Sequence, residues 1–571
     1  MKMLISKIEI GLIIGFFFFI FNILVENAGG INLQLPLNIF VSILGCLLLF
    51  TTSVRFFLFG LKIDKIFYFL LAGFVSIILP VIFHDKTLLD YYWEKYLMLF
   101  MALIVYLALY NNLLKKYYLT IIFYSAFLQL VIGLLQINLK PGVLEPFVMT
   151  GLQSANGSMQ QINIYAVFVS VGMLCGALSF NKFNKTSRVL VVIYIIATVY
   201  TILFRDNGGT GRVIVLISLL LATFFVCRIY VCKHEKLFEF KEKNIFFAAF
   251  VIILISVLLY VNKSSVIPAL GERVTIYKFV LQGISEKLIA GHGLGTFPQY
   301  FASSQGEVVQ QSIEKLGADL GESAYGLVYR TMHPHNEILL MLFEFGIVPF
   351  LLLIVLLMVI SKKTKLISIE NKRYLLALSP IVLSLNLTMT FYLSYWLMLM
   401  ALMIFASTDS DMYKLKNGFS KSLAAVCLLF VICTLPYLNN TYMAVKGFHK
   451  YLITNSRDKS MFEVSEYNAL GNMIDGYKLY EQAMNDLSNK DLVDDFTRWS
   501  EKVILYRPLE MHYVRLVRVL TLSNRFREAF YWSLESAKRY PYSQDIRRQF
   551  YPLKELYEHL ESDDSGGALE P

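Results

Sequence analysis

The chain has 571 residues, of which 56% are hydrophobic and only 16% are charged, and its formal net charge is +10. Its mean hydropathy is +0.57, and a soluble domain carries about 25% charged residues. These values exclude a soluble globular enzyme and indicate an all-α, polytopic membrane protein, because a helix satisfies its own backbone hydrogen bonds in hydrocarbon. A transmembrane barrel is excluded as well, since the apolar runs are continuous and do not alternate.

Apolar runs of about 20 residues recur over the first 440 positions and predict about thirteen membrane-spanning helices. The first run lacks a small-residue cleavage site, so we expect a span there and not a cleaved signal peptide. The expected spans are 8–25, 36–60, 66–83, 96–110, 117–137, 162–180, 189–204, 212–230, 244–262, 337–360, 373–389, 391–407 and 421–440.

Lys and Arg are distributed unequally between the two sets of short connections. One set, which begins at Lys2 and ends at Lys421, holds 22 of them, and the other holds 5, from Lys86 to Arg212. Cytoplasmic loops carry the excess of positive charge, so we expect a cytoplasmic N-terminus. An odd number of spans then places the C-terminus outside. The net positive charge is therefore a topology signal, and it does not predict nucleic-acid binding.

Two soluble parts are expected on the outer side. One is a large loop at 263–336 within the membrane domain 1–440, and the other is a C-terminal domain at 441–562. The stretch 511–541 predicts two helices joined at 523–525, with Ala529 and Ala537 on the packing side, and it resembles one tetratricopeptide unit. Residues 563–571 are expected to be a linker or tag remnant.

Three of the eight histidines, His292, His333 and His335, lie in the outer loop. His335 is placed where the loop meets an apolar span, and the ordinary pKa of an imidazole, about 6.5, suits a general base. The other interpretation is structural, because Asn336 is a good helix cap and polar residues are common at an interface. A metal site is a further alternative, but no His/Glu pair at helical spacing or carboxylate cluster completes one.

A few arginines lie on the predicted outer side, although most of the positive charge lies on the predicted cytoplasmic side. Arg205 and Arg212 flank a glycine-rich turn between two spans, and Arg273 lies early in the large loop. Guanidinium groups bind phosphate bidentately and keep their charge, so these residues are candidates for holding a diphosphate. Snorkelling of arginine at the end of a span is the alternative.

The loop at 151–163 is rich in amides and ends at Gln161 and Asn163. Amides beside an apolar span suit the hydroxyls of a sugar, and they equally suit a plain turn. The soluble parts contain no phosphate loop, dinucleotide fingerprint or acidic nucleotide-sugar motif, which disfavours an enzyme driven by ATP or by a nucleotide sugar.

Several of these segments, in this order, resemble the O-antigen ligase and polymerase superfamily of bacterial inner membranes. The likeness covers roughly 150–440, and it is nearest to the O-linked protein oligosaccharyltransferases that glycosylate pilins. The resembling segments are Gln161–Asn163, Thr210–Arg212, Arg273–Tyr277 with the glycines Gly291, Gly293 and Gly295, and His333–Asn336 followed by Glu344–Gly346. The family's Gln-Pro-Asn has Ile162 here, and its later acidic-Tyr-Pro-Leu appears as 390–393, which leaves Tyr392 or Tyr395 as the family's tyrosine.

The resemblance implies an inner-membrane enzyme that transfers an oligosaccharide en bloc from undecaprenyl diphosphate to a Ser or Thr hydroxyl of a periplasmic or pilin-like protein. It implies His335 as the general base and Arg212 and Arg273 as the diphosphate ligands, with no metal and no cofactor. The supporting or glycan-binding residues that it implies are Gln161, Asn163, Tyr277, Lys278, His333, Asn336 and Tyr392.

Three other functions stay open from the sequence. A ligase to lipid A-core or a repeat-unit polymerase would use the same donor but a different acceptor. A transporter would carry charged pairs and broken helices at the bilayer midplane in two related halves, and no such halves are found. A membrane-anchored scaffold would use the C-terminal helices alone and leave the His and Arg residues without a role.

Overall fold

The computed structural model describes residues 2–19, 32–78, 89–141, 143, 152–159, 161–205, 209–232, 276–293, 295–302, 333–348, single positions between 350 and 374, 376–386, 394–408, 412–415, 417–454, 456–541 and 543–564. The predicted span 244–262, most of the predicted loop 263–336, and the site residues Arg273 and Tyr392 lie outside the described residues.

Five of the described helices are long and apolar enough to cross a membrane. They coincide with the spans predicted at 36–60, 117–137, 162–180, 189–204 and 421–440. The coarse prediction of a helical, multi-span protein is therefore confirmed, whereas a total of about thirteen spans stays a prediction. The five are α2 (Pro36–Phe59), Leu113–Asn138 including α5 (Tyr118–Asn138), Ile162–Lys182 including α6 (Ile162–Ser179), Lys185–Phe204 including α7 (Lys185–Val199), and α19 (Asn417–Ile453).

Shorter helices fill the space between these five. In α4, α8 and α18 the apolar stretches are 97–110, 210–223 and 395–406, which are shorter than a straight span requires. The shorter helices are α1 (Lys2–Phe18), α3 (Lys65–Ile78), α4 (Leu89–Tyr110), α8 (Gly209–Cys232), α13 (Glu337–Phe345), α16 (Ser379–Leu385) and α18 (Tyr395–Ala406).

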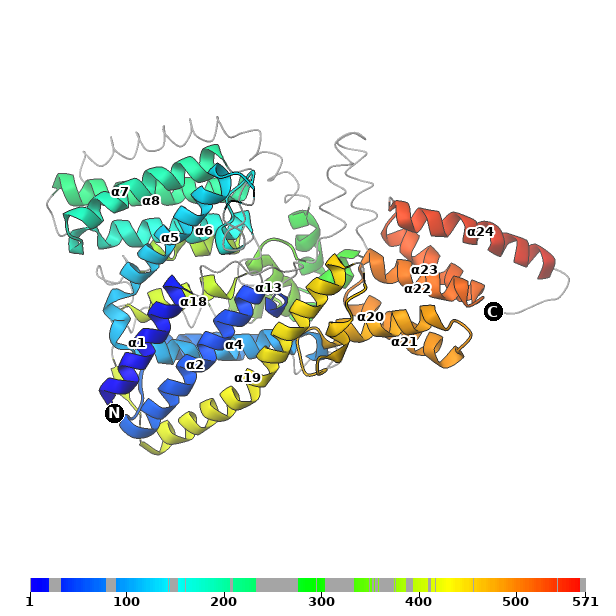
Figure 1. Ribbon diagram of the computed structural model, residues 1–571, viewed down its shortest axis with the longest axis horizontal. Coiled ribbons are helices and arrows are strands. Elements are labelled where there is room, and N and C mark those ends of the chain that lie inside the picture. Colours follow the sequence, from blue (N-terminus) through cyan, green and yellow to red (C-terminus); the bar gives the residue numbers. More distant parts are fainter. Residues whose placement is uncertain are drawn as a thin grey trace.

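The helices of the membrane domain pack in two groups (Figure 1). One group consists of α5, α6, α7 and α8, and the other consists of α1, α2, α4, α18 and α19. Because α1 and α18 also contact α5, one apolar core runs through both groups. Trp396 of α18 is fully buried in this core, with its ring against Phe16 and Phe17 of α1.

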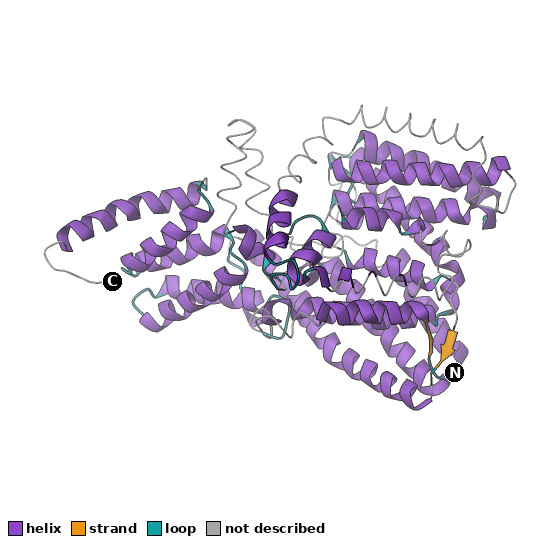
Figure 2. Ribbon diagram, turned by 180° about the vertical axis from the view of Figure 1, so that it is seen from behind, coloured by secondary structure: helices purple, strands orange, loops and turns teal. Residues whose placement is uncertain are grey.

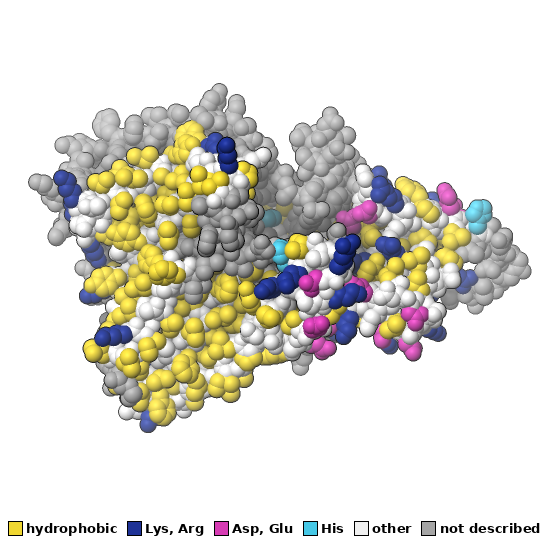
Figure 3. All heavy atoms as spheres, viewed as in Figure 1, with side chains coloured by type: hydrophobic (Ala, Val, Ile, Leu, Met, Phe, Trp, Pro, Cys, Tyr) yellow, Lys and Arg dark blue, Asp and Glu magenta, His cyan; other side chains and the backbone are white. Residues whose placement is uncertain are grey.

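Large apolar side chains also cover the outside of this bundle. On the face shown in Figure 3 they spread over the helices of the membrane domain, and charged side chains gather over the C-terminal helices. An apolar surface of this extent requires lipid or a partner to cover it, which agrees with a multi-pass membrane protein. On α7 and α19 the exposed apolar residues include Val189, Val192, Ile193, Ile196, Leu428, Leu429 and Ile432.

The lysine-rich connections meet at one end of the bundle. Strand β1 (Lys62–Asp64) follows α2 and pairs antiparallel with β2 (Met412–Lys414), which lies between α18 and α19. The Ser407 hydroxyl donates to the carbonyl of Lys115 at 3.3 Å, which brings in the connection between α4 and α5. This two-stranded ribbon was not predicted. The assignment of this end to the cytoplasm stays a prediction.

A buried ion pair ties three helices together at the same end. Nη1 of Arg55, near the end of α2, lies 2.9 Å from Oε2 of Glu9 in α1, and both side chains are buried. Arg55 also donates to the carbonyl of Asn111 after α4 at 2.6 Å and to the Ser6 hydroxyl at 3.0 Å. The guanidinium is thereby surrounded by acceptors, which a buried charge requires.

The other end of the bundle carries the first turns of α2, α6, α8 and α18. The backbone N–H of Tyr395, which begins α18, donates to Oδ1 of Asn38 in the first turn of α2 at 2.9 Å. The side chain of Gln136 near the end of α5 accepts from the N–H of Gly157 at 2.8 Å and so holds the turn before α6. Arg205, after α7, donates to the carbonyl of Ile137 at 3.2 Å, so α8 begins at this end as well.

α19 runs unbroken from Asn417 to Ile453 and therefore crosses the domain boundary predicted at residue 440. The C-terminal helices follow it and lie at one end of the molecule (Figures 1 and 2). α24 extends past the predicted domain end at residue 562. These helices are α20 (Gly471–Asn485), α21 (Lys490–Tyr506), α22 (Glu510–Leu522), α23 (Phe526–Arg539) and α24 (Gln544–Asp564).

The helical pair predicted at 511–541 is confirmed as α22 and α23. Asn524 joins them in a left-handed conformation with φ of 62°, and the N–H of Arg525 donates to the carbonyl of Leu520 at 2.9 Å. Ala529 is fully buried, and Ala537 packs against the same apolar cluster, as the sequence pattern predicted.

We predict that the two ends of the bundle lie on opposite sides of the membrane. Alkaline phosphatase fused after Ile453, where α19 ends, should be active, because this enzyme folds only outside the cytoplasm. The matched fusion after Asn112, at the lysine-rich end, should be inactive. Activity after Asn112 together with inactivity after Ile453 would reverse the orientation and place the histidines in the cytoplasm.

Candidate functional site

The histidine corner consists of His333, His335 and Asn336, immediately before α13. Asn336 has extended backbone angles, and its Oδ1 accepts the N–H of Leu339 at 3.0 Å. The helix cap predicted at Asn336 is therefore present, and it satisfies one of the free donors at the helix start. This capping role holds beside any catalytic role of the neighbouring histidines.

His335 has a left-handed backbone conformation, with φ of 55°. This conformation costs about 1–3 kcal/mol in a residue with a Cβ atom and persists only where the surroundings impose it. The N–H of His335 donates to Nδ1 of His333 at 2.9 Å, and its carbonyl lies 3.4 Å from the Tyr277 hydroxyl, which shares its single hydrogen with the closer carbonyl of Asn386. Both peptide groups of His335 are thus held, while its side chain is half-buried.

His333 lies beneath this corner and is 3% exposed. Its Nε2 atom is 3.4 Å from Oε2 of Glu337, the first residue of α13. The two ring nitrogens of His333 therefore face a backbone donor on one side and a carboxylate on the other. The sequence analysis missed this His/Glu pair, although its spacing of four residues was a readable signal.

Tyr277 connects the corner to the rest of the bundle. It lies in the helical segment 276–286, and its hydroxyl donates to the carbonyl of Asn386 at 2.9 Å. Asn386 ends α16, which packs against α6 and α8. Lys278, the next residue, has an exposed side chain. Tyr277 and the histidine corner are thereby linked, through α16, to α6 and α8, which carry Asn163 and Arg212.

Gln161 and Asn163 lie at the start of α6. Gln161 is exposed and has extended backbone angles, and its side chain makes no capping bond. Oδ1 of Asn163 is buried, and it has no hydrogen-bond partner among the described residues. The preceding turn is held by Gln129 and Gln136 of α5, which accept backbone N–H groups of 156–158. The turn itself is thus structural, whereas Gln161 is exposed and the buried Oδ1 of Asn163 has no partner in the part of the chain that the structure describes.

Arg212 lies in the first turn of α8 and is 8% exposed, so it is far more buried than a snorkelling arginine would be. α8 packs along α6, which places Arg212 and Asn163 on neighbouring helices at one end of the bundle.

Arg205 is exposed and bonds to the end of α5, which gives it a structural role. Tyr395, one of the two candidate tyrosines, is buried at the start of α18.

His292 belongs to the packing of the loop and not to the histidine corner. Its ring stacks on Phe343 with 4.4 Å between centroids and an interplanar angle of 8°. Its Nε2 is 2.8 Å from the carbonyl of Gly283. The buried Glu344, which belongs to the resembling segment 344–346 but was given no role from the sequence, accepts the N–H of Gly295 at 2.8 Å. The glycine-rich turn therefore serves to pack segment 288–297 against α13.

The span predicted at 337–360 begins at Glu337 as expected, but it is not one continuous helix, because α13 ends at Phe345. Gly346 follows with φ of 75°, and the N–H of Ile347 donates to the carbonyl of Leu288 at 2.8 Å. Hydropathy cannot detect this break, since the residues on both sides are apolar. The break lets the loop and α13 form one small apolar cluster around Phe297 and Phe343.

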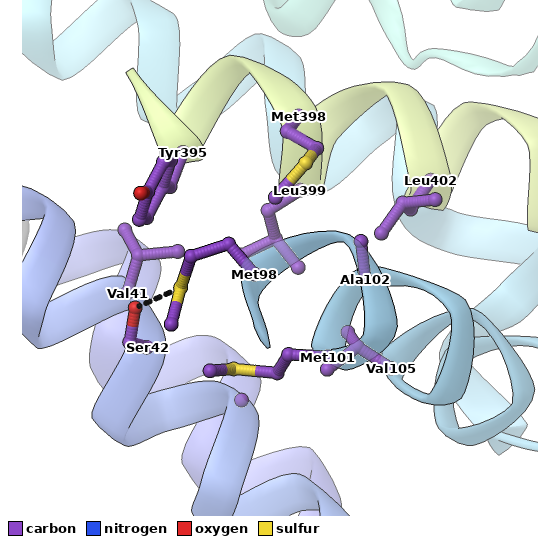
Figure 4. Close-up of a pocket in the computed structure, with 11 residues that line it drawn as sticks. Val41, Ser42, Met98, Met101, Ala102, Val105, Tyr395, Met398, Leu399 and Leu402 are labelled. Atoms are coloured by element: carbon purple, nitrogen blue, oxygen red, sulfur yellow. Dashed lines mark hydrogen bonds between the residues drawn. The ribbon is translucent and has the colours of Figure 1, made fainter. Parts of the chain in front are cut away.

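A separate apolar pocket lies between α2, α4 and α18 (Figure 4). Its walls are hydrocarbon and thioether groups, and they include Met98, Met101 and Met398. The Ser42 hydroxyl is already bonded to the Asn38 carbonyl and to the sulfur of Met98. The lining contains no charged side chain, so this pocket suits an apolar chain and not a diphosphate.

Among the described residues, no three His, Cys, Asp or Glu side chains lie close enough together to hold a metal ion. Comparisons of the chain with protein-family models, with curated proteins and with solved structures found no match.

Replacing Gly346 by Ala should destabilise the histidine corner. A Cβ atom there would lie 2.3 Å from the carbonyl oxygen of Ile289, and the positive φ is strained for any residue with a Cβ. We expect a lower midpoint of thermal unfolding in detergent, with a loss of about 2 kcal/mol or more. Gly418→Ala is the control, because a Cβ at that position in α19 meets nothing within 4 Å. Equal midpoints for Gly346→Ala and wild type would contradict this packing.

Proposed function

We propose that this protein is a bacterial inner-membrane O-oligosaccharyltransferase. It moves an oligosaccharide en bloc from undecaprenyl diphosphate to a Ser or Thr hydroxyl of a periplasmic or pilin-like protein. The proposal joins the family resemblance of the sequence to the arrangement of the histidine corner. It needs no metal, no cofactor and no nucleotide, because a lipid diphosphate is already a good leaving group.

One observation carries the proposal: His335 is held in a strained conformation at the start of α13 by His333 and Tyr277. Strain of this kind persists where the surroundings impose it, and it gathers at functional sites. The neighbouring Asn336 suffices as the helix cap, so capping does not explain the strain at His335. A half-buried imidazole at an end of an apolar bundle is well placed to receive a lipid-borne substrate.

The proposed reaction is a single displacement. His335 accepts the proton of the acceptor hydroxyl as the oxygen attacks the anomeric carbon of the sugar. The bond between this carbon and the phosphate oxygen breaks, and the lipid diphosphate leaves with the electron pair. Arg212 and Arg273 stabilise the charge that develops on the diphosphate. Asn163 offers its Oδ1 atom to a sugar hydroxyl, with Gln161, Lys278 and Tyr392 as further candidate contacts.

The C-terminal helices favour a protein acceptor over lipid A-core or a growing polymer. The helices α20 to α24 each pack against the next, and in our proposal they are stacked pairs of the tetratricopeptide type, which suit the binding of a polypeptide. In our proposal they lie in the periplasm and select the acceptor. A ligase or polymerase needs no such domain, since its acceptor is itself a glycan or a glycolipid.

His335→Ala should abolish glycan transfer while the protein stays in the membrane at normal level. Cells that make a lipid-linked glycan and express a pilin acceptor should give a glycosylated acceptor only when the active protein is present. Removal of a general base should cost about 10²-fold or more. His559→Ala in α24 is the matched control, because this histidine is exposed in the C-terminal domain. Transfer by His335→Ala above about a tenth of wild type would falsify the assignment of the base.

Exchanging the C-terminal helices should change the acceptor and leave donor use intact. The structure places the junction after Ile453, because a cut at residue 440 would divide α19. A hybrid protein that carries the corresponding domain of another protein oligosaccharyltransferase should modify the acceptor of that enzyme. Loss of donor use in a well-inserted hybrid would instead make these helices part of the reaction site.

A further inference from the structure

We propose that Glu337 is a positioning residue that acts through His333 to hold His335 in its left-handed conformation. The inference rests on the proposed function, in which His335 removes the acceptor proton. Oε2 of Glu337 lies 3.4 Å from Nε2 of His333, and Nδ1 of the same ring accepts the N–H of His335 at 2.9 Å. The three residues form one chain of polar contacts that ends at the backbone of His335.

The chain requires one tautomer of His333. A neutral imidazole has one N–H and one nitrogen with a free lone pair. Because Nδ1 accepts the backbone N–H of His335, the hydrogen of the His333 ring must be on Nε2, which faces the Glu337 carboxylate. A carboxylate beside one ring nitrogen fixes the tautomer and the orientation of the ring.

The arrangement also depends on the burial of His333. His333 is 3% exposed, so water does not compete for its Nδ1 atom. If the ring carried its hydrogen on Nδ1, two N–H groups would point at each other, and if the ring turned over, a C–H group would take the place of Nδ1. The backbone of His335 would then lose the acceptor that opposes its conformational strain, and the imidazole of His335 would leave its position.

Glu337 has one competing role, because it is also the first residue of α13. A negative charge in the first turn of a helix interacts favourably with the helix dipole. Interaction with the helix dipole needs the negative charge of Glu337 but does not depend on the exact length of its side chain. The positioning role needs an acceptor at the right distance and does not need the full charge, so two conservative variants separate the roles.

Glu337→Gln keeps the length of the side chain and an oxygen that can accept the Nε2 hydrogen of His333. Glu337→Asp keeps the charge at the start of α13 but is one methylene shorter. If Glu337 positions the ring, Gln should restore transfer and Asp should not. If Glu337 serves only the helix, Asp should restore transfer and Gln should not.

The experiment measures glycan transfer by the purified full-length protein, with matched amounts of wild type and variants and a defined lipid-linked glycan. We expect Glu337→Ala to lower kcat by about 10- to 100-fold with KM for the donor unchanged, as when a group that orients a functional histidine is removed. Glu337→Asp should behave like Glu337→Ala, and Glu337→Gln should stay within about threefold of wild type. Adding Glu337→Ala to His333→Ala should cause no further loss, because the two residues act as a unit.

The experiment separates a failure of the proposed function from a failure of the positioning role of Glu337. If wild type transfers no glycan, the proposed function is wrong. If wild type is active, His335→Ala is inactive and Glu337→Ala keeps full kcat, only the role of Glu337 is overturned. Rescue by Asp and not by Gln, or a rise in KM alone, also overturns it. Should Glu337→Ala fail to accumulate in the membrane, the comparison of Gln with Asp decides the matter by itself.

Discussion

The membrane domain depends on the pairing of its buried polar groups, and the ion pair between Arg55 and Glu9 shows this most clearly. In hydrocarbon a polar group cannot turn to water, so it must find its partners inside the protein. Arg55 finds them in Glu9, Ser6 and the carbonyl of Asn111, which come from different parts of the chain. Satisfying one charge therefore fixes α1, α2 and the end of α4 relative to one another. The apolar surfaces between these helices then supply most of the contact area, but they specify register less sharply than the ion pair does.

The same constraint operates at the opposite end with a different result. There the polar groups are not all used to join helices. Nε2 of His333 lies 3.4 Å from the Glu337 carboxylate, Nδ1 of the same ring accepts the N–H of His335, and Asn163 keeps an oxygen without a partner among the described residues. At the lysine-rich end the buried polar groups hold helices together. At the end that carries Asn163, one buried polar atom has no partner in the described part of the chain. This difference between two ends of one bundle agrees with the proposed reaction site at the histidine corner.

The sequence predicted the features that depend on local pattern. Apolar length located α2, α5, α6, α7 and α19, and helical period located the pair α22 and α23. It missed features that depend on partners far along the chain. The ribbon of β1 and β2 joins residues 62–64 to 412–414, and the break at Gly346 follows from its packing against segment 288–291. The pair of His333 and Glu337 has the spacing of neighbours on one helix. His333 lies before α13, however, so the helical pattern of the sequence does not join the two residues. The donor and the acceptor rest on the family resemblance, because no contact in the structure identifies a sugar or a lipid.

α19 leaves the bundle as one helix that ends at Ile453, with Pro436 inside it, and α20 packs back on the end of α19 through the ring contact of Tyr451 with Tyr477. A flexible linker would spread a captured polypeptide over a large volume and lower its effective concentration at the reaction site. If the proposed function holds, a helix that continues from the bundle to the C-terminal helices would set one separation between the site that binds a polypeptide and the site that modifies it. Recognition then need not read the sequence around the modified hydroxyl. An acceptor would be chosen by how far its hydroxyl lies from the gripped segment, and moving that hydroxyl along the polypeptide would change its use without changing how tightly the polypeptide is held.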